Sequence, residues 1–309
     1  MASSAIAKRG ILITGATGKQ GGATIDALIS EGALKEYILL GVTRDATSAG
    51  AKGLESRGVR VVQGDFSDCK SLFENAKTAL GRDGSKIHGV FSVQASDKNE
   101  EVQGKSLIDA AMANNVRHFV YSSVDRGGPL RSPTNPTNVP HFASKHNIER
   151  HLMGAKSTAT DGMRWTILRP VAFMDNLTPG FGAKLVATGW QLLLGNKPIQ
   201  LIATRDIGFF AARALLRPDE YAGRSISLAG DELTIKQIGS VFKTTTGTPL
   251  PTTMPLAARM IFWLSKDVGS MMKWFASDGY GADINALRAE YPKLQTFSDW
   301  MKQSPWVKK

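Results

Sequence analysis

Short apolar runs alternate with longer, helix-like stretches along the first 170 residues of the chain. Short continuous apolar runs are typical of strands that are buried on both faces. Such runs lie at 11–14, 37–43, 59–62, 87–93, 118–123 and 164–168. Between them, helices are expected at 23–30, 48–56, 67–80, 100–115 and 142–155. This alternation predicts an α/β fold, in which helices cover both faces of a parallel sheet.

The first apolar run leads into a glycine-rich turn that precedes a helix. Glycines at 15, 18 and 21 let the backbone turn tightly, approach a pyrophosphate closely and bring the helix onto its strand. The helix N-terminus adds free N–H groups and a partial positive charge. The spacing G-x-x-G-x-x-G differs from the usual G-x-G-x-x-G, but its place between strand and helix predicts a dinucleotide site. The expected cofactor contacts in this turn are Gly15, Thr17, Gly18, Lys19, Gln20 and Gly21.

The second strand ends at Thr43-Arg44, where an NAD-specific site would carry an acidic residue against the ribose. An arginine at this point can hold a 2′-phosphate and stack on adenine, so Arg44 favours NADP. Asp45 follows it, and a shift of one residue in register would reverse that preference. Arg44 can also be read as a solvated loop charge.

Two further strand ends carry candidate cofactor contacts. Asp65 and Phe66 follow the third strand, where an adenine is expected, and Val93 and Gln94 follow the fourth, beside the expected nicotinamide ribose. Asp68 lies in the same stretch, but we expect it to cap the next helix.

The regular pattern stops between residues 125 and 140, where glycines and prolines indicate a long loop. This loop follows a strand, so we expect it to form a rim of the substrate pocket. After Pro170 the chain becomes richer in glycine and aromatic residues, and we expect most of these aromatic side chains in the core. They are Phe173, Phe181, Trp190, Phe209, Phe210, Phe262, Trp263, Trp274 and Phe275. We therefore expect a nucleotide-binding part at 1–170 and a smaller, interleaved cap at 171–309.

Composition narrows the classes of partner. The net charge is +11, from 38 Lys and Arg against 27 Asp and Glu, but the basic residues are dispersed. A phosphate-bearing cofactor or a solvated basic surface accounts for this charge, and nucleic-acid binding is not expected. The single cysteine, Cys69, excludes an internal disulfide and a cysteine metal cluster; we expect it to be a buried filler, and no metal site is expected.

No apolar run approaches the ~20 residues that a transmembrane helix needs. The nearest candidate, residues 255–275, is interrupted by Arg259, Lys266, Asp267 and Lys273. The first residues lack the apolar segment of a secretory leader, so a cytoplasmic location without membrane insertion is expected.

The combination of these motifs resembles the NmrA-like branch of the atypical short-chain dehydrogenases. The resemblance rests on the turn 14–22, Thr43-Arg44, Gln63-Gly64-Asp65, Tyr121-Ser122-Ser123, His141-Phe142-x-x-Lys145 and Leu168-Arg169-Pro170. It implies a doubly wound Rossmann fold that binds NADP in its first half. Short-chain dehydrogenases use a serine and a Tyr-x-x-x-Lys pair for proton transfer coupled to hydride transfer, whereas this chain has His141 in place of the tyrosine.

Two functions are compatible with a histidine in place of the tyrosine. In the first, the chain is an NADPH-dependent reductase of a small, rather apolar carbonyl or enone substrate. Lys145 then orients the cofactor and delivers a proton directly or through water, while Ser122 or Ser123 binds the substrate oxygen. His141 is the alternative acid, since imidazole titrates near ~6.5, or it only contacts the pocket wall. In the second, the chain senses NADP(H) or NAD(P)+ without catalysis and controls a protein partner such as a transcription factor. The sequence indicates neither the substrate nor the oligomeric state.

Overall fold

The computed structural model describes residues 8–81, 85–155 and 162–307. Residues 1–7, in which no leader was expected, lie outside the described residues. The described chain forms two compact units that exchange segments. The first unit comprises Met1–Ser123, Asn147–Leu168 and Ile207–Ser225, and the second comprises Val124–His146, Arg169–Asp206 and Ile226–Lys309. The two ranges expected from the sequence, 1–170 and 171–309, follow this division only in outline, and as functional domains they stay a prediction.

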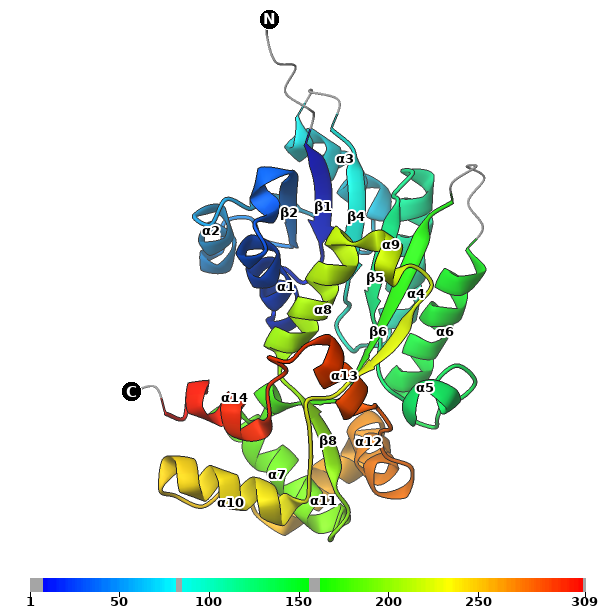
Figure 1. The fold of residues 1–309 in the computed structure, drawn as a ribbon. Coiled ribbons are helices and arrows are strands. Elements are labelled where there is room, and N and C mark those ends of the chain that lie inside the picture. Colours follow the sequence, from blue (N-terminus) through cyan, green and yellow to red (C-terminus); the bar gives the residue numbers. More distant parts are fainter. Residues whose placement is uncertain (1–7, 82–84, 156–161, 308–309) are drawn as a thin grey trace, which may run out of the picture. The chain divides into compact units, whose positions relative to one another are not determined.

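A sheet of seven described strands forms the centre of the fold (Figure 1). Its order is β3-β2-β1-β4-β5-β6-β9, and the pairs from β3 through β6 are parallel. The strands are β1 (Arg9–Ile13), β2 (Tyr37–Thr43), β3 (Arg60–Gln63), β4 (Ile87–Ser92), β5 (His118–Ser122), β6 (Arg164–Pro170) and β9 (Ser225–Leu228). The strand order reverses direction between β1 and β4, which is the switch point where doubly wound folds bind their ligands. The predicted Rossmann fold is confirmed.

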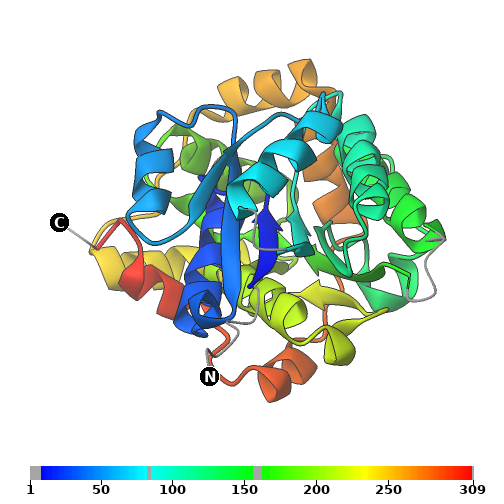
Figure 2. The same ribbon diagram turned by 90° about the horizontal axis from the view of Figure 1, so that it is seen from above.

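Helices cover both faces of this sheet. The helices of the first unit are α1 (Lys19–Ser30), α2 (Ala49–Glu55), α3 (Cys69–Leu80), α4 (Glu100–Ala113) and a short α9 (Pro218–Tyr221). Two more helices, α6 (Pro140–Gly154) and α8 (Thr204–Leu216), begin in the second unit and belong to the first from residues 147 and 207 on. Leu72, Leu107 and Ile148, from α3, α4 and α6, share one buried cluster with the strands. On the other face, α1 and α8 touch: a Cβ at Gly208 would lie 2.3 Å from the carbonyl oxygen of Ala23. Figure 2 shows α3 (cyan) and α8 (yellow-green) on opposite sides of the sheet.

Most predicted element boundaries agree with the structure, and two expectations are corrected. Helix α1 begins at Lys19 rather than residue 23, because the backbone of the glycine turn already coils, with the N–H of Gly22 donating to the carbonyl of Gly18. The loop at 125–140 contains a short helix, α5 (Gly128–Arg131), with Pro129 in its first turn. Proline is favoured there because its missing N–H would have no helical partner.

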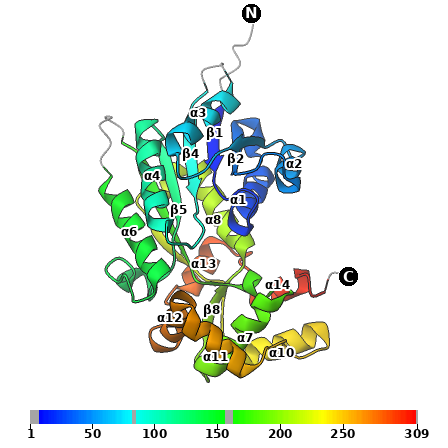
Figure 3. The same ribbon diagram turned by 180° about the vertical axis from the view of Figure 1, so that it is seen from behind.

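The second unit is built around a small sheet with the order β10-β8-β7. Its strands are β7 (Ala172–Phe173), β8 (Ile199–Ile202) and β10 (Asp231–Leu233). Its helices include α7 (Phe181–Leu193), α10 (Ile235–Thr246), α11 (Pro255–Leu264), α12 (Lys266–Ser277), α13 (Ile284–Glu290) and α14 (Phe297–Gln303). Figure 3 shows α7, α10 and α11 around β8. Trp190, Trp274 and Phe275 lie in the core of this unit, as expected, but Phe181 and Trp263 are exposed.

The single cysteine is a buried residue of α3, as predicted. Cys69 is 7% exposed, and its thiol faces the carbonyl of Phe66 at 3.6 Å. Burial, reinforced by the charge of Asp68, raises the pKa of the thiol to about 11. The residue therefore stays a neutral thiol near neutral pH.

None of the described helices combines the length and the apolar character needed to cross a membrane.

Candidate functional site

The glycine turn after β1 forms a backbone cradle in which two positions exclude any side chain. Gly15 has φ of +57°, in the left-handed region, and a Cβ there would lie 2.9 Å from Cγ1 of Val93. A Cβ at Gly21 would lie 2.2 Å from the carbonyl oxygen of Gly15. Gly18 closes the turn, because its N–H donates to that same carbonyl at 2.8 Å. The turn leaves Gly15, Thr17, Gly18 and Lys19 exposed, so the N-terminus of α1 is open to an anionic ligand.

Thr14 fixes this turn to the neighbouring strand. Its buried hydroxyl accepts a hydrogen bond from the N–H of Val93 at 2.8 Å and lies 3.0 Å from the carbonyl of Val93. The contact brings Val93, an expected nicotinamide-side residue, against Gly15 of the cradle. Sequence reasoning did not assign a role to Thr14; the signal was a hydroxyl residue between the apolar strand and the first glycine.

Ser122, a predicted catalytic residue at the end of β5, contacts Gln20, a predicted cofactor-binding residue of the glycine turn. The hydroxyl of Ser122, which is 1% exposed, donates to Oε1 of Gln20 at 2.5 Å. Ser123 is also buried, and its hydroxyl donates to the carboxylate of Glu149 on α6. Both serine hydroxyls therefore have protein partners within the first unit, whereas we expected one of them to bind a substrate oxygen.

Two residues at the end of β2, Arg44 and Asp45, are candidates for selecting NADP or NAD, and they differ in their contacts. Arg44 is exposed. The carboxylate of Asp45 accepts from the N–H and the hydroxyl of Thr47, at 2.8 and 2.6 Å. These hydrogen bonds lower the pKa of Asp45 and commit its charge to the local turn. The charge of Asp45 is therefore held within its own turn, whereas the exposed side chain of Arg44 lies close enough to Asp65 to lower the pKa of that carboxyl.

The next strand end carries Asp65 and Phe66, as expected for the adenine side. Asp65 is exposed and accepts from the N–H of Ser67 at 2.8 Å, which lowers its pKa, and the charge of Arg44 contributes to the same shift. Phe66 is half-buried. Asp68 accepts from the N–H of Ser71 at 3.0 Å, which confirms it as the cap of α3.

Gln94 contributes an unpaired polar atom to the region after β4. The residue is 6% exposed, and its Nε2 donates to the hydroxyl of Ser92 at 2.9 Å. Its Oε1 is buried and has no hydrogen-bond partner among the residues that the structure describes. A buried acceptor of this kind is costly unless a ligand or water satisfies it. Together with the cradle, this acceptor fits a dinucleotide along the strand ends of the first unit.

Helix α6 carries the two remaining candidates, His141 and Lys145, on one face, since residues four apart are neighbours on a helix. Nδ1 of His141 lies 2.7 Å from Oδ1 of Asp267, and the same oxygen accepts from the backbone N–H of His141 at 3.1 Å. The imidazole also meets the edge of Phe142, with ring centroids 4.6 Å apart. Lys145 is half-buried. Sequence reasoning missed Asp267, because it is distant in sequence and belongs to no motif.

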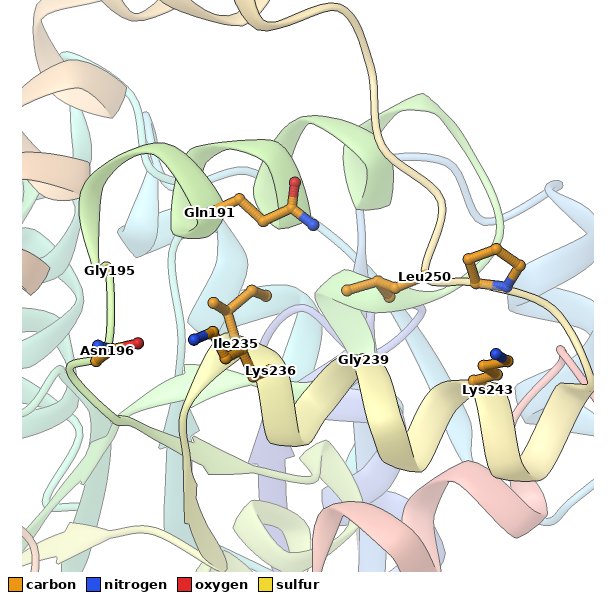
Figure 4. Close-up of a pocket in the computed structure, with 9 residues that line it drawn as sticks. Gln191, Gly195, Asn196, Ile235, Lys236, Gly239, Lys243 and Leu250 are labelled. Atoms are coloured by element: carbon orange, nitrogen blue, oxygen red, sulfur yellow. The ribbon is translucent and has the colours of Figure 1, made fainter.

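A separate cavity of about 520 Å³ lies within the second unit between α7 and α10 (Figure 4). It includes none of the predicted site residues. Its lining combines two lysines with amide and apolar side chains: Gln191, Asn196, Ile235, Lys236, Lys243 and Leu250.

Comparison with known proteins identifies the family of the chain. A profile described as the NmrA-like family matches residues 7–301. The chain belongs to the NmrA-like family. The NAD(P)H azoreductase of Xenophilus azovorans is 29% identical over 208 residues, which are 67% of this chain and 64% of the azoreductase. The match thus spans less than two thirds of that relative's length.

Solved structures of NmrA-like and related proteins share the fold. The triphenylmethane reductase of Citrobacter sp., complexed with NADP(H), superimposes with a TM-score of 0.70 at 16% identity and covers 95% of this chain and 99% of its own. NmrA, a negative transcriptional regulator in complex with NADP, has a TM-score of 0.63 at 16% identity and covers 96% and 95%. Proteins similar to this NmrA-like chain therefore include both NADP(H)-binding reductases and a regulator.

Proposed function

We propose that this NmrA-like chain is an NADP-dependent oxidoreductase of the atypical short-chain dehydrogenase type. Its proposed substrate is a small, rather apolar carbonyl or enone compound. The observation that carries the proposal is the cradle at Gly15 and Gly21, where a Cβ would meet Val93 or the backbone of the turn. Such a close backbone approach at a helix N-terminus suits a pyrophosphate.

The proposed preference for NADP rests on Arg44. Its exposed guanidinium is available to a 2′-phosphate, and a charge-assisted, bidentate contact with phosphate is among the stronger hydrogen bonds of proteins. The carboxylate of Asp45 is held by Thr47 instead of facing a ribose hydroxyl. NADP-bound relatives support the same choice.

NADPH, when bound, supplies the hydride, and the proposed task of the chain is to orient the substrate and move a proton. Lys145 is proposed to hold the cofactor. His141 is the proposed proton donor, because Asp267 accepts from Nδ1 and so directs Nε2 away from the carboxylate. The role of Ser122 is to hold Gln20 of the cradle through its hydroxyl.

A second candidate function is a redox sensor that controls a protein partner. Two observations favour it: His141 stands where short-chain dehydrogenases have a tyrosine, and the hydroxyls of Ser122 and Ser123 donate hydrogen bonds to Gln20 and Glu149. A sensor of this kind binds NADP(H) without consuming it.

Turnover separates the two functions. The purified chain is incubated with NADPH and a panel of apolar ketones, enones, quinones and azo compounds, and oxidation of NADPH is followed by absorbance. The reductase predicts sustained oxidation with at least one compound, and Lys145→Ala serves as the control for contaminating activity. Tight NADPH binding by calorimetry with no turnover across the panel would favour the sensor.

A further inference from the structure

Helix α11 exposes a ridge of large apolar side chains to solvent. We define the α11 ridge as Leu256, Met260, Trp263 and Leu264, which are 71%, 59%, 81% and 69% exposed. On a helix of 3.6 residues per turn, these positions fall within about one third of the circumference. Met254, just before the helix, is 71% exposed and extends the apolar surface. Isolated exposed apolar residues are ordinary, but a contiguous set of this kind indicates an interaction surface.

The opposite face of α11 is firmly packed, so the ridge is no misplaced part of the core. Ala258 is fully buried, and Phe262 faces α7, where a Cβ at Gly189 would lie 2.8 Å from its ring. The turn into α12 is equally close, since a Cβ at Gly269 would lie 2.1 Å from the carbonyl oxygen of Phe262. Two faces of this short helix are therefore apolar, and only one of them has a partner within the described chain.

The charged residues along the ridge segment, 254–266, are all basic. Arg259 and Lys266 are exposed at its edge and its end, and the sequence from 254 to 266 contains no acidic residue. The nearest carboxylate along the chain, Asp267, accepts two hydrogen bonds from His141. A second copy of the chain placed symmetrically on the ridge would bring these like charges together.

We propose that the α11 ridge docks on an anionic phospholipid surface. Leucine, methionine and tryptophan side chains that project from a helix flanked by arginine and lysine are suited to the boundary between headgroups and acyl chains. The helix has ten residues, too few to span a bilayer, so it lies in the interface. Tryptophan favours this depth, because its ring is apolar and its N–H is polar.

Vesicle binding tests the proposal. The full chain is sedimented with vesicles of phosphatidylcholine mixed with phosphatidylglycerol, and with vesicles of phosphatidylcholine alone. We expect binding to the anionic vesicles, weakened by salt and by Arg259→Gln with Lys266→Gln. The double variant Leu256→Gln, Met260→Gln should bind about tenfold more weakly or worse, since two large apolar side chains lose their burial. Leu130→Gln is the matched control, because Leu130 is 91% exposed on α5 of the same unit.

Fluorescence identifies the face that binds. Trp263 is 81% exposed, whereas Trp190, Trp274 and Trp300 are buried and Trp165 and Trp306 are half-buried. Insertion of the ridge should therefore shift the emission of Trp263 to the blue and allow its quenching by brominated acyl chains, with Trp263→Phe as the background. Trp263→Phe keeps an apolar ring, so it should still bind vesicles but lose this shift. The proposal is overturned if the chain does not bind anionic vesicles, or if the Leu256→Gln, Met260→Gln variant binds them as tightly as the Leu130→Gln control. It is also overturned if the blue shift persists in Trp263→Phe. A concentration-dependent dimer that the ridge variant dissociates would also overturn it and make the ridge an interface between copies.

Discussion

Asp267 holds both the side chain and the backbone of His141: one carboxylate oxygen lies 2.7 Å from Nδ1 and 3.1 Å from the amide nitrogen. A carboxylate only accepts hydrogen bonds, so Nδ1 carries a proton in this contact. In the neutral imidazole, Nε2 is then an acceptor, and on protonation it becomes a donor while Asp267 stabilises the positive charge. This relationship makes the role of His141 testable through two residues.

If His141 is the acid, His141→Phe should lower turnover by about 10²-fold and remove the alkaline limb of the pH profile, where turnover falls because the imidazole has lost the proton that it donates. Asp267→Ala should lower turnover less and displace the same limb, because the imidazole remains but loses its orientation. His151→Phe is the matched control: His151 lies on the same helix and also pairs with an aspartate, Asp109, at 2.6 Å. Equal turnover in the wild type and in His141→Phe would show that the histidine only contacts the pocket wall and takes no part in the chemistry.

Lys145→Ala should reduce turnover by about 10²-fold or more, through loss of cofactor positioning and of proton delivery. Calorimetry should at the same time show weaker NADPH binding, which a purely structural lysine would not affect. Arg150→Ala, an exposed basic residue on the same helix, provides the control. If Lys145→Ala and His141→Phe both keep full activity on an identified substrate, the chemistry lies elsewhere.

NADPH should bind more tightly than NADH, and Arg44→Ala should erode the difference. The contact with a 2′-phosphate contributes on the order of 1.5 to 3 kcal/mol, or roughly tenfold or more in affinity. Lys52→Ala, an exposed basic residue on α2, should leave the ratio of the two affinities unchanged. Equal affinities for both cofactors in the unmodified protein, measured by calorimetric titration, would refute the assignment.

Substitutions at Gly18 and Gly21 of the cradle should differ in their effect on stability. Gly18→Val should abolish NADPH binding while leaving the fold largely intact, because a branched side chain would block the approach of the backbone to the pyrophosphate, whereas a Cβ at Gly18 would make only a tight contact, 3.2 Å from the carbonyl oxygen of Gly15. Gly21→Ala should also destabilise the chain, since its Cβ would lie 2.2 Å from that carbonyl. Thermal unfolding and calorimetry together check this pair, and near-normal NADPH affinity in a folded Gly18→Val variant would show that the turn is only structural.

His118 should make the first unit less stable in acid. It is fully buried, and its Nε2 lies 2.9 Å from the hydroxyl of Thr166, whose own proton goes to the carbonyl of Tyr221. Burial lowers the pKa of His118 from 6.5 to about 4. The unfolded chain therefore binds this proton more readily than the folded chain, so stability falls as the pH drops from 6.5 to about 4, by at most ~3 kcal/mol.

Urea unfolding across that pH range measures the effect, and His118→Gln should flatten the curve. Asp206 works in the opposite direction, because burial raises its pKa to about 6 and stability from this group grows as it is protonated. An unchanged pH dependence in His118→Gln would mean that His118 is not the group responsible.

The sequence predicted the parts of this protein that local patterns control. The parallel strands appear as apolar runs because both faces are buried, and the cap of α3 follows from the chemistry of Asp68. Contacts between distant segments left no such signal. The contacts of Asp267 with His141 and of Glu149 with Ser123 depend on how the chain folds back. Trp263 is exposed, although a large aromatic side chain is usually mostly buried. The glycine cradle was predictable because its backbone geometry excludes other residues, whereas the role of Thr14 needed the neighbouring strand.

The buried thiol of Cys69 has a practical consequence for spectroscopy. It is the chain's single cysteine, and its protonated, enclosed sulfur should react slowly with maleimides or methanethiosulfonates. A cysteine introduced at any exposed position would then be labelled selectively in the otherwise native sequence. Spin labels or fluorophores placed in pairs, one on α4 and one on α10, would report distances across the molecule in solution, with and without nucleotide, and without first removing a native thiol.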